Sequence, residues 1–197
     1  MTLPLKHIFD KMNGICQMPQ QLELLLLKSI VRQEIPKNHV LLEPGQICDY
    51  YYYVEKGILS CKRWIKEKEY YMWLMFAGDI ATSVDSFNCR VLSEETIRSV
   101  TSCTLYLLHW DHAENFRKRY QAFADIRNYL SYEYASHAWN MGVKRPPEEL
   151  YDYLKELHGE QLLVLPRDML AAYMGISKPL LYNIIKNDRL KKKRGDK

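Results

Sequence analysis

The stretch RDMLAAYMGISKPLLYNIIK, from Arg167 to Lys186, decides how the rest of the chain is interpreted. It predicts two short helices around a turn at Gly175, because glycine adopts the positive φ of such a turn freely. Ser177 is a good N-cap for the second helix. An i, i+3, i+4 apolar stripe follows in that helix: Leu181, Ile184 and Ile185. This spacing is typical of a helix-turn-helix, whose second helix enters the DNA major groove, and a plain helical hairpin in an α-helical core is the alternative.

The positive charge of the chain gathers just after this segment. The whole chain carries 28 Lys or Arg and 24 Asp or Glu, a net charge of +4. From Lys186 to Lys197, seven Lys or Arg and two Asp give +5, so the remainder carries −1. Basic charge beside a groove-binding helix can bind phosphates, which favours double-stranded DNA as a partner. A solubilising tail from Lys191 to Arg194 is the alternative.

Composition and length bound the class of protein. The chain has 197 residues, 47% of them hydrophobic and 26% charged, which fits one compact globular domain plus a small one. Its five Cys form no C-x-x-C pair, and without a signal peptide they favour free thiols in the cytoplasm. No apolar run approaches the ~20 residues that span a membrane. No nucleophile–base pair, phosphate loop or metal-ligand spacing is present, so we do not expect an enzyme.

The first half of the chain changes from helix to strand near Pro36. Residues 5–31 are predicted to be helical, with an interruption near Gly14 to Pro19. Beyond Pro36, short aromatic and β-branched runs alternate with turns that contain glycine, which favours an antiparallel sandwich or barrel. The predicted strands are 39–42, 47–55, 58–65, 69–76, 96–101 and 104–110.

The second half predicts a long amphipathic helix. Between Ala122 and Met141 apolar residues recur every three or four positions, over about five turns. The members that we assign to a dimer interface are Phe123, Ile126, Leu130, Tyr134 and Met141. A stripe of this length favours pairing with its copy in a homodimer, and packing on the chain's own barrel is the alternative.

Taken together, the chain resembles the cyclic-AMP receptor/fumarate-nitrate regulator (Crp/Fnr) family of bacterial transcription factors. The segments that carry the resemblance are LLEPGQICDYYYYVEKGILSCKRW, FAGDIATSVDSF, IRSVTSCTLYLLHWDHAENF and LAAYMGISKPLLYNIIK. Gly45, Gly57 and Gly78 fall on the family's jelly-roll glycines. The resemblance implies an α+β chain with three parts: a β jelly-roll, cyclic-nucleotide-binding-like sensor domain (1–121), a dimerisation helix (122–142) and a helix-turn-helix DNA-binding domain (143–197).

The resemblance also implies an effector pocket. Family members that bind cyclic nucleotides carry a Gly-Glu pair for the ribose and an Arg-Ser/Thr pair for the phosphate, and here these positions are Ser83-Val84 and Ser93-Glu94. An anionic phosphate needs a guanidinium and a helix N-terminus, so the carboxylate of Glu94 argues against cyclic AMP. The implied pocket residues are Gly78, Asp79, Ser83, Asp85, Ser86, Ser93 and Glu94. No cofactor or metal is predicted, and an unknown small-molecule effector stays open.

The second helix departs from the family pattern. The family often has Ser-Arg-Glu-Thr followed by an Arg, whereas this chain has Ser177-Lys178-Pro179-Leu180 and then Asn183. Because Pro179 replaces a glutamate that accepts from cytosine, the base preference must differ. We expect DNA contacts from Arg167, Ser177, Lys178, Tyr182, Asn183 and Lys186, with RNA polymerase as a further candidate partner. The rival hypothesis is a module of the same fold that has lost DNA recognition and binds a protein or a small ligand.

Overall fold

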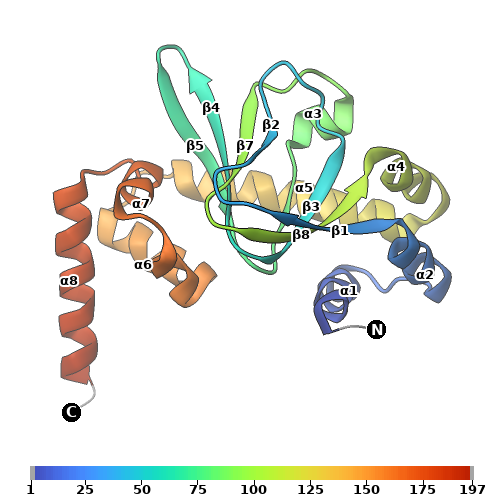
Figure 1. Cartoon of the computed structure of the whole chain (residues 1–197). Helices are drawn as coiled ribbons and strands as arrows, with labels where there is room; N and C mark the ends of the chain where they lie inside the picture. The colour runs from blue at the N-terminus through green and yellow to red at the C-terminus, as the bar shows by residue number, and fades with distance from the viewer. Residues whose placement is uncertain (1–2, 196–197) are drawn as a thin grey trace. The chain divides into compact units, whose positions relative to one another are not determined.

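The computed structural model describes residues 3–195, and for residues 3–5 and 191–195 it describes only the backbone. The chain forms two compact units that divide between His137 and Ala138 (Figure 1). This division falls inside helix α5 (Gln121–Gly142), which belongs to both units. The expected three-part division into sensor, dimerisation helix and DNA-binding domain stays a prediction.

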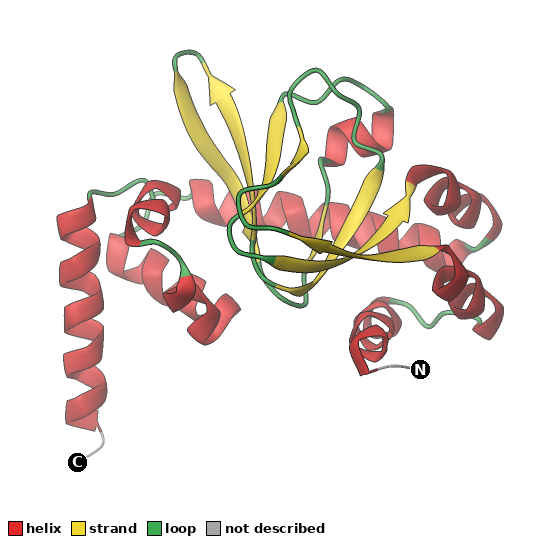
Figure 2. Ribbon diagram, in the orientation of Figure 1, coloured by secondary structure: helices red, strands yellow, loops and turns green. Residues whose placement is uncertain are grey.

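Two four-stranded antiparallel sheets form the strand framework of the first unit (Figure 2). One sheet has the order β1-β8-β3-β6, with β1 at Ile30–Ile35, β8 at Cys103–His109, β3 at Tyr50–Lys56 and β6 at Ile80–Ala81. The other has the order β2-β7-β4-β5, with β2 at Val40–Leu42, β7 at Glu95–Ser99, β4 at Leu59–Ile65 and β5 at Lys68–Met75. The antiparallel arrangement and the mixture of helix and strand agree with the sequence prediction.

The core of this unit is built by alternation along the strands. Successive side chains of a strand point to opposite faces, so one face of each sheet can be apolar throughout. The deepest members of the core, none more than 1% exposed, are Leu22, Val54, Leu59, Phe87, Ile97 and Leu105. The tyrosine run of β3 follows the same rule: Tyr51 packs on Phe87 with the rings tilted by 48° and their centroids 4.2 Å apart, while Tyr50 and Tyr52 point the other way.

The turn between β3 and β4 requires glycine. Gly57 has φ +99°, and a Cβ at this position would lie 2.6 Å from both Ser102 O and Cys103 Sγ. Gly78 has the same φ, but a Cβ there would meet nothing within 4 Å. Gly57 is therefore fixed by a close backbone approach, whereas Gly78 is needed only for its backbone conformation.

Five helices accompany the sheets. They are α1 (Leu3–Ile15), α2 (Gln20–Ser29), α3 (Val84–Cys89), α4 (Trp110–Arg119) and the long α5. The sequence predicted helix as far as Val31, but α2 ends at Ser29 and β1 begins at Ile30, because the following residues pair with β8. The short elements α3 and β6 were also not predicted.

The elbow between α4 and α5 is held by one carboxylate. Glu114 accepts hydrogen bonds from Arg117 at 2.6 and 2.7 Å and from Arg127 at 3.1 Å. Arg127 lies on α5 and also donates to Asn88 Oδ1 at 2.9 Å. The hydrogen bonds from Arg117, followed by those from Arg127, lower the pKa of Glu114 to about 2. An ion pair with Glu114 therefore fixes the start of α5 against α4, and the hydrogen bond to Asn88 fixes it against α3.

The second unit is helical. After the end of α5 it contains α6 (Pro147–His158), a 3-10 helix (Gly159–Val164), α7 (Arg167–Tyr173) and α8 (Lys178–Gly195). Its buried core comprises Leu150, Tyr151, Leu154, Leu162, Leu165, Leu170, Ala171, Leu181, Ile184 and Ile185. The sequence predicted the last helix as far as Lys186, but α8 continues to Gly195 and includes the backbone of the basic run. With 18 residues, α8 is about 27 Å long.

Candidate functional site

The turn between α7 and α8 is closed by the backbone. Gly175 has φ +68°, and its N–H donates to Ala172 O at 3.2 Å. The next N–H, from Ile176, reaches back to Ala171 O at 3.0 Å. Ser177 then precedes α8, and its Oγ accepts from Leu180 N at 3.4 Å. The carbonyls at the end of α7 and the first amides of α8 are thereby satisfied locally, which sets the sharp change of direction.

One face of α8 packs on its own unit and the other is open. Leu181, Ile184 and Ile185 are at most 6% exposed. The exposed residues in and just before the first turns include five that the sequence singled out for DNA contact: Ser177, Lys178, Tyr182, Asn183 and Lys186. The structure therefore brings these five together on a polar, basic surface with no acidic side chain among them. The side chains of Lys191 to Arg194, assigned to phosphates or to a solubilising tail, lie outside the described side chains.

Arg167, the sixth expected DNA contact, has a different environment. It is the first residue of α7 and is only partly exposed. Its Nη1 is buried and has no hydrogen-bond partner among the described residues. Burial raises the pKa of Tyr151, and the charge of Arg167 is among those that oppose this rise. Arg167 thus lies beside the core of the second unit, and its side chain is less exposed than those of the five residues named above.

Three of the seven expected effector residues form a buried serine group. Ser83 Oγ and Ser93 Oγ are 3.3 Å apart, and both residues are at most 4% exposed. Ser86 Oγ accepts from Cys48 N at 2.9 Å and donates to Val91 O at 2.7 Å. Ser83 and Ser93 thus bond each other, while Ser86 bonds the backbone, so the three hydroxyls stabilise the segment around α3.

The other four lie elsewhere. Asp79 Oδ2 caps the β5–β6 turn by accepting from Phe76 N at 2.8 Å, and burial raises its pKa. Lys11 donates to Gly78 O at 3.2 Å. Asp85 and Glu94 are exposed, and Glu94 pairs with Arg63. The seven residues are therefore divided between a buried group, a turn and two exposed carboxylates, and none of them lines the cavities described next.

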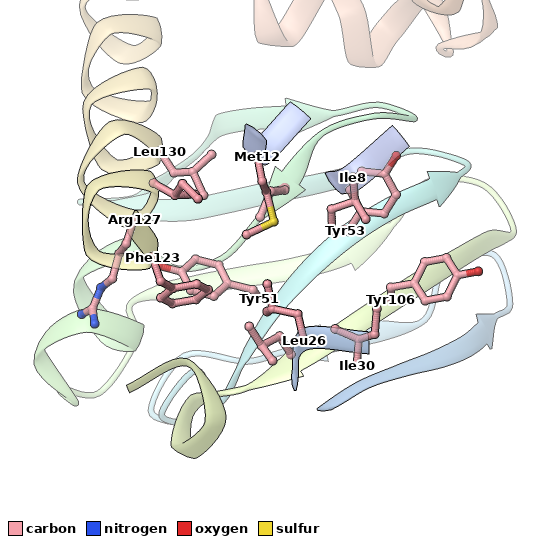
Figure 3. Close-up of a pocket in the computed structure, with 13 residues that line it drawn as sticks. Ile8, Met12, Leu26, Ile30, Tyr51, Tyr53, Tyr106, Phe123, Arg127 and Leu130 are labelled. Carbon is pink, nitrogen blue, oxygen red and sulfur yellow. The ribbon is translucent and has the colours of Figure 1, made fainter. Parts of the chain in front are cut away.

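An apolar pocket lies between the β1-β8-β3-β6 sheet and the helices that cover it (Figure 3). Its volume is about 40 Å³. Tyr53 and Tyr106 point their hydroxyls to one side of it, while the guanidinium of Arg127 points away (Figure 3). The remaining lining is Ile8, Met12, Leu26, Ile30, Tyr51, Ile80, Leu108, Phe123, Ile126 and Leu130. Such a space, without charged partners, suits only a few apolar atoms.

A second cavity, of about 580 Å³, opens beside the loop between β2 and β3. It is lined by Leu41, Leu42, Gly45, Gln46, Ile47, Asp49, Tyr50, Tyr52 and Leu92. The sequence analysis missed both cavities. The alternation of the tyrosine run 50–53 is the signal for them, because Tyr51 and Tyr53 line the apolar pocket whereas Tyr50 and Tyr52 line the second cavity. Within the described residues, no three His, Cys, Asp or Glu side chains are grouped as metal ligands.

The apolar stripe of α5 packs within the chain. Phe123 and Ile126 are 3% and 1% exposed and belong to the core of the first unit, so the prediction that they face a partner is wrong. Leu130 and Tyr134 are partly buried against the same core. Met141 is partly exposed, and for it the prediction stays untested. The sheet of the same chain supplies the apolar surface that the stripe requires, which is the alternative given above.

Solved structures similar to this chain include regulators of the Crp/Fnr family. FixK2 from Bradyrhizobium japonicum matches 82% of this chain and 85% of its own at 12% identity, with a TM-score of 0.67. A regulator assigned to the Crp/Fnr family from Eubacterium rectale matches 93% and 88% at 15% identity, with a TM-score of 0.66. A CooA variant from Carboxydothermus hydrogenoformans matches 84% and 79% at 14% identity, with a TM-score of 0.62. No protein-family model and no curated protein sequence matches the chain.

These likenesses cover both units, so the chain has the fold of the Crp/Fnr regulators. Proteins with this fold combine a sheet-rich unit with a helical unit. Across residues 3–195, no helix is long and apolar enough to cross a bilayer.

Proposed function

We propose that this protein is a dimeric, DNA-binding transcription regulator of the Crp/Fnr type. The observation that carries the proposal is the exposed face of α8, which follows a tight turn and presents polar and basic side chains over a fully buried apolar face. A helix held this way can enter the major groove while its unit supports it from behind. The eight strands in two sheets then form the jelly roll, and α7 and α8 form the helix-turn-helix.

Asn183 is the residue we assign to a base. Its amide can pair bidentately with adenine, and it is exposed in the second turn of α8. Lys178, at the start of α8, lies five positions earlier, about 140° away around the helix, so it reaches a phosphate or a guanine at the edge of the groove instead. Pro179 has no donor, which removes one base contact from the first turn. We therefore expect specificity to depend on few side chains.

Dimerisation is assigned to the face of α5 that the core leaves uncovered. Tyr129 and Tyr132 are 43% and 68% exposed, and their ring centroids are 6.5 Å apart. Trp139, seven residues after Tyr132, is 76% exposed. The spacing 129, 132, 139 follows the heptad positions of a helix pair. A two-fold dimer would present two copies of α8, so its operator should be an inverted repeat with half-sites about one helical turn apart. RNA polymerase stays a predicted partner to which no residue is assigned.

Cyclic AMP is not the effector in this proposal. At the two positions where nucleotide-binding relatives hold the ribose and the phosphate, the Ser83 and Ser93 hydroxyls bond each other. Among the described side chains, the adjacent Glu94 pairs with the guanidinium of Arg63, and the carboxylate neutralises it. A phosphate there would face this carboxylate, and the guanidinium of Arg63 is already compensated by it, which disfavours phosphate binding.

A gel-shift titration against salt tests the DNA proposal. The intact protein should bind an inverted-repeat site selected from random DNA, and Asn183→Ala should weaken that site by ~1–3 kcal/mol while changing random DNA little. Asn187→Ala is the matched control, because Asn187 lies a turn further along α8 beside Glu148, Asp152 and Asp188, which repel phosphates. Equal losses on both DNAs would remove Asn183 from base recognition. If the intact protein binds no DNA at low salt, the rival ligand- or protein-binding module becomes the better hypothesis.

A further inference from the structure

The hydroxyl of Tyr134 forms hydrogen bonds with both the N–H and the C=O of Thr82, the residue that follows β6. Tyr134 lies on α5, and its Oη accepts from Thr82 N at 3.0 Å and donates to Thr82 O at 3.2 Å. Thr82 is 3% exposed, so water is not available to these two groups. A buried N–H or C=O without a partner is costly, which makes one phenol responsible for satisfying two backbone groups.

The surroundings of this hydroxyl form a built site. The Trp73 ring, 4% exposed, meets the Tyr134 ring edge to face at a centroid distance of 6.1 Å and an angle of 87°. Thr82 Oγ1 is fixed in turn, since it donates to Tyr50 O at 3.0 Å and lies 3.4 Å from the buried Cys48 Sγ. One donor, one acceptor and an aromatic wall are the groups that recognise a phenol, which has one O–H and a ring.

The hydrogen bonds between Tyr134 and Thr82 hold α5 close to the end of the first unit. Tyr134 lies three residues before the point where the first unit ends, on the helix that continues into the second unit. The earlier contacts of α5, from Phe123 to Leu130, are mostly apolar, and Arg127 adds hydrogen bonds to Glu114 of α4 and to Asn88 of α3. The two hydrogen bonds to Thr82 are directional, so they fix the rotation and height of α5 at its exit from the first unit in a way that apolar contacts do not.

We propose that Thr82 and Trp73 form a phenol-binding site that the chain fills with its own Tyr134, so that a built-in ligand holds α5 in place. This goes beyond the proposed function, because the site lies entirely in the first unit and is tested without DNA. The chemical class that the site accepts is a para-substituted phenol, and p-cresol reproduces the Tyr134 side chain.

Removal of the side chain should open the site to a free phenol. Calorimetry on full-length Tyr134→Ala should show saturable binding of p-cresol with a dissociation constant of about 1 mM or tighter. Toluene, which has the ring without the hydroxyl, should bind at least about tenfold more weakly, since it leaves the Thr82 backbone unpaired. Wild type should not bind either probe saturably. Equal binding of toluene and p-cresol, or no binding to a folded variant, would overturn the proposal.

A second variant covers the case in which Tyr134→Ala does not fold. Tyr134→Phe keeps the ring and loses only the hydroxyl, so the amide of Thr82 should exchange with solvent deuterium about tenfold faster than in wild type. Tyr70→Phe is the matched control, because Tyr70 is 43% exposed on β5 of the same unit, and it should leave this amide unchanged. If Tyr134→Phe leaves the exchange rate of the Thr82 amide as in wild type, the hydroxyl does not hold the site and the proposal is wrong.

Discussion

Replacement of Tyr132 by alanine should weaken the dimer strongly. Tyr132 exposes 68% of its surface, so of the ~200 Å² that an aromatic side chain buries, about 140 Å² is free for a partner. At ~25 cal/mol per Å², complete burial is worth about 3.5 kcal/mol per copy, and about 7 kcal/mol for the two copies of a two-fold interface. If half of this area is covered, the loss is about 3.5 kcal/mol, which is roughly a 300-fold weaker dissociation constant.

Sedimentation equilibrium over a range of protein concentrations measures this constant directly. The control variant is Leu92→Ala, because Leu92 is similarly exposed, at 64%, but lies in the loop before β7. The control should dimerise like wild type, and both variants should keep the circular dichroism of wild type, since neither side chain supports the core.

Two results would refute the reasoning. If wild type is monomeric at micromolar concentration, the exposed aromatic face of α5 does not pair with its copy. If wild type is dimeric but Tyr132→Ala dissociates within about threefold of it, the dimer uses another surface, and the heptad spacing of the exposed aromatics is a coincidence.

Three further predictions concern stability and ligand binding. Gly57→Ala should lower the free energy of unfolding by ~2–4 kcal/mol in urea titrations, because the new Cβ meets Ser102 O. Gly78→Ala, with the same φ but open space, should cost only ~1–2 kcal/mol, and equal losses would contradict the clash. Since the pKa of Glu114 is lowered to about 2, its hydrogen bonds stabilise the fold fully above about pH 5. The difference in the free energy of unfolding between wild type and Glu114→Gln, about 2 kcal/mol, should therefore shrink as pH falls from 5 towards 2. A constant difference would contradict stabilisation by the ionised Glu114. Calorimetry with cyclic AMP should show no saturable binding in the micromolar range. Saturable binding there would contradict the conclusion that the Glu94 carboxylate prevents a phosphate from binding.

Features with local causes could be predicted from the sequence. The start of α8 depends on Ser177 and on an apolar stripe within the next two turns, and both are visible in the sequence. The end of α8 was placed too early. A run of like charges disfavours a helix, yet α8 continues through it, and the pairing of Lys155 with Asp188 holds α8 to α6 beyond the predicted end.

Features with non-local causes could not be predicted. β1 exists because Ile30 to Ile35 pair with β8, more than 65 residues away, and no local pattern reports that partner. The stripe of α5 shows the same limit. Its periodicity indicates that one face is buried, but not which surface covers that face. In the structure, the core of the same chain covers Phe123 and Ile126. The exposed Tyr132 lies on the other face, and the dimer interface that we propose there stays a prediction.

The tyrosine on α5 limits how an effector could act at the Thr82 site. A ligand that enters this site must first displace Tyr134, and it can shift the equilibrium only by the difference between its affinities for the two states. If the displaced state is populated at about 1%, the apparent affinity of any such ligand is weakened about 100-fold. A ligand that binds the empty site at micromolar concentration would then need roughly 0.1 mM in solution. Control through the Thr82 site would therefore require an abundant or very tightly bound phenol. At lower phenol concentrations, the DNA affinity of the proposed dimer should depend on the abundance of the protein through the monomer–dimer equilibrium.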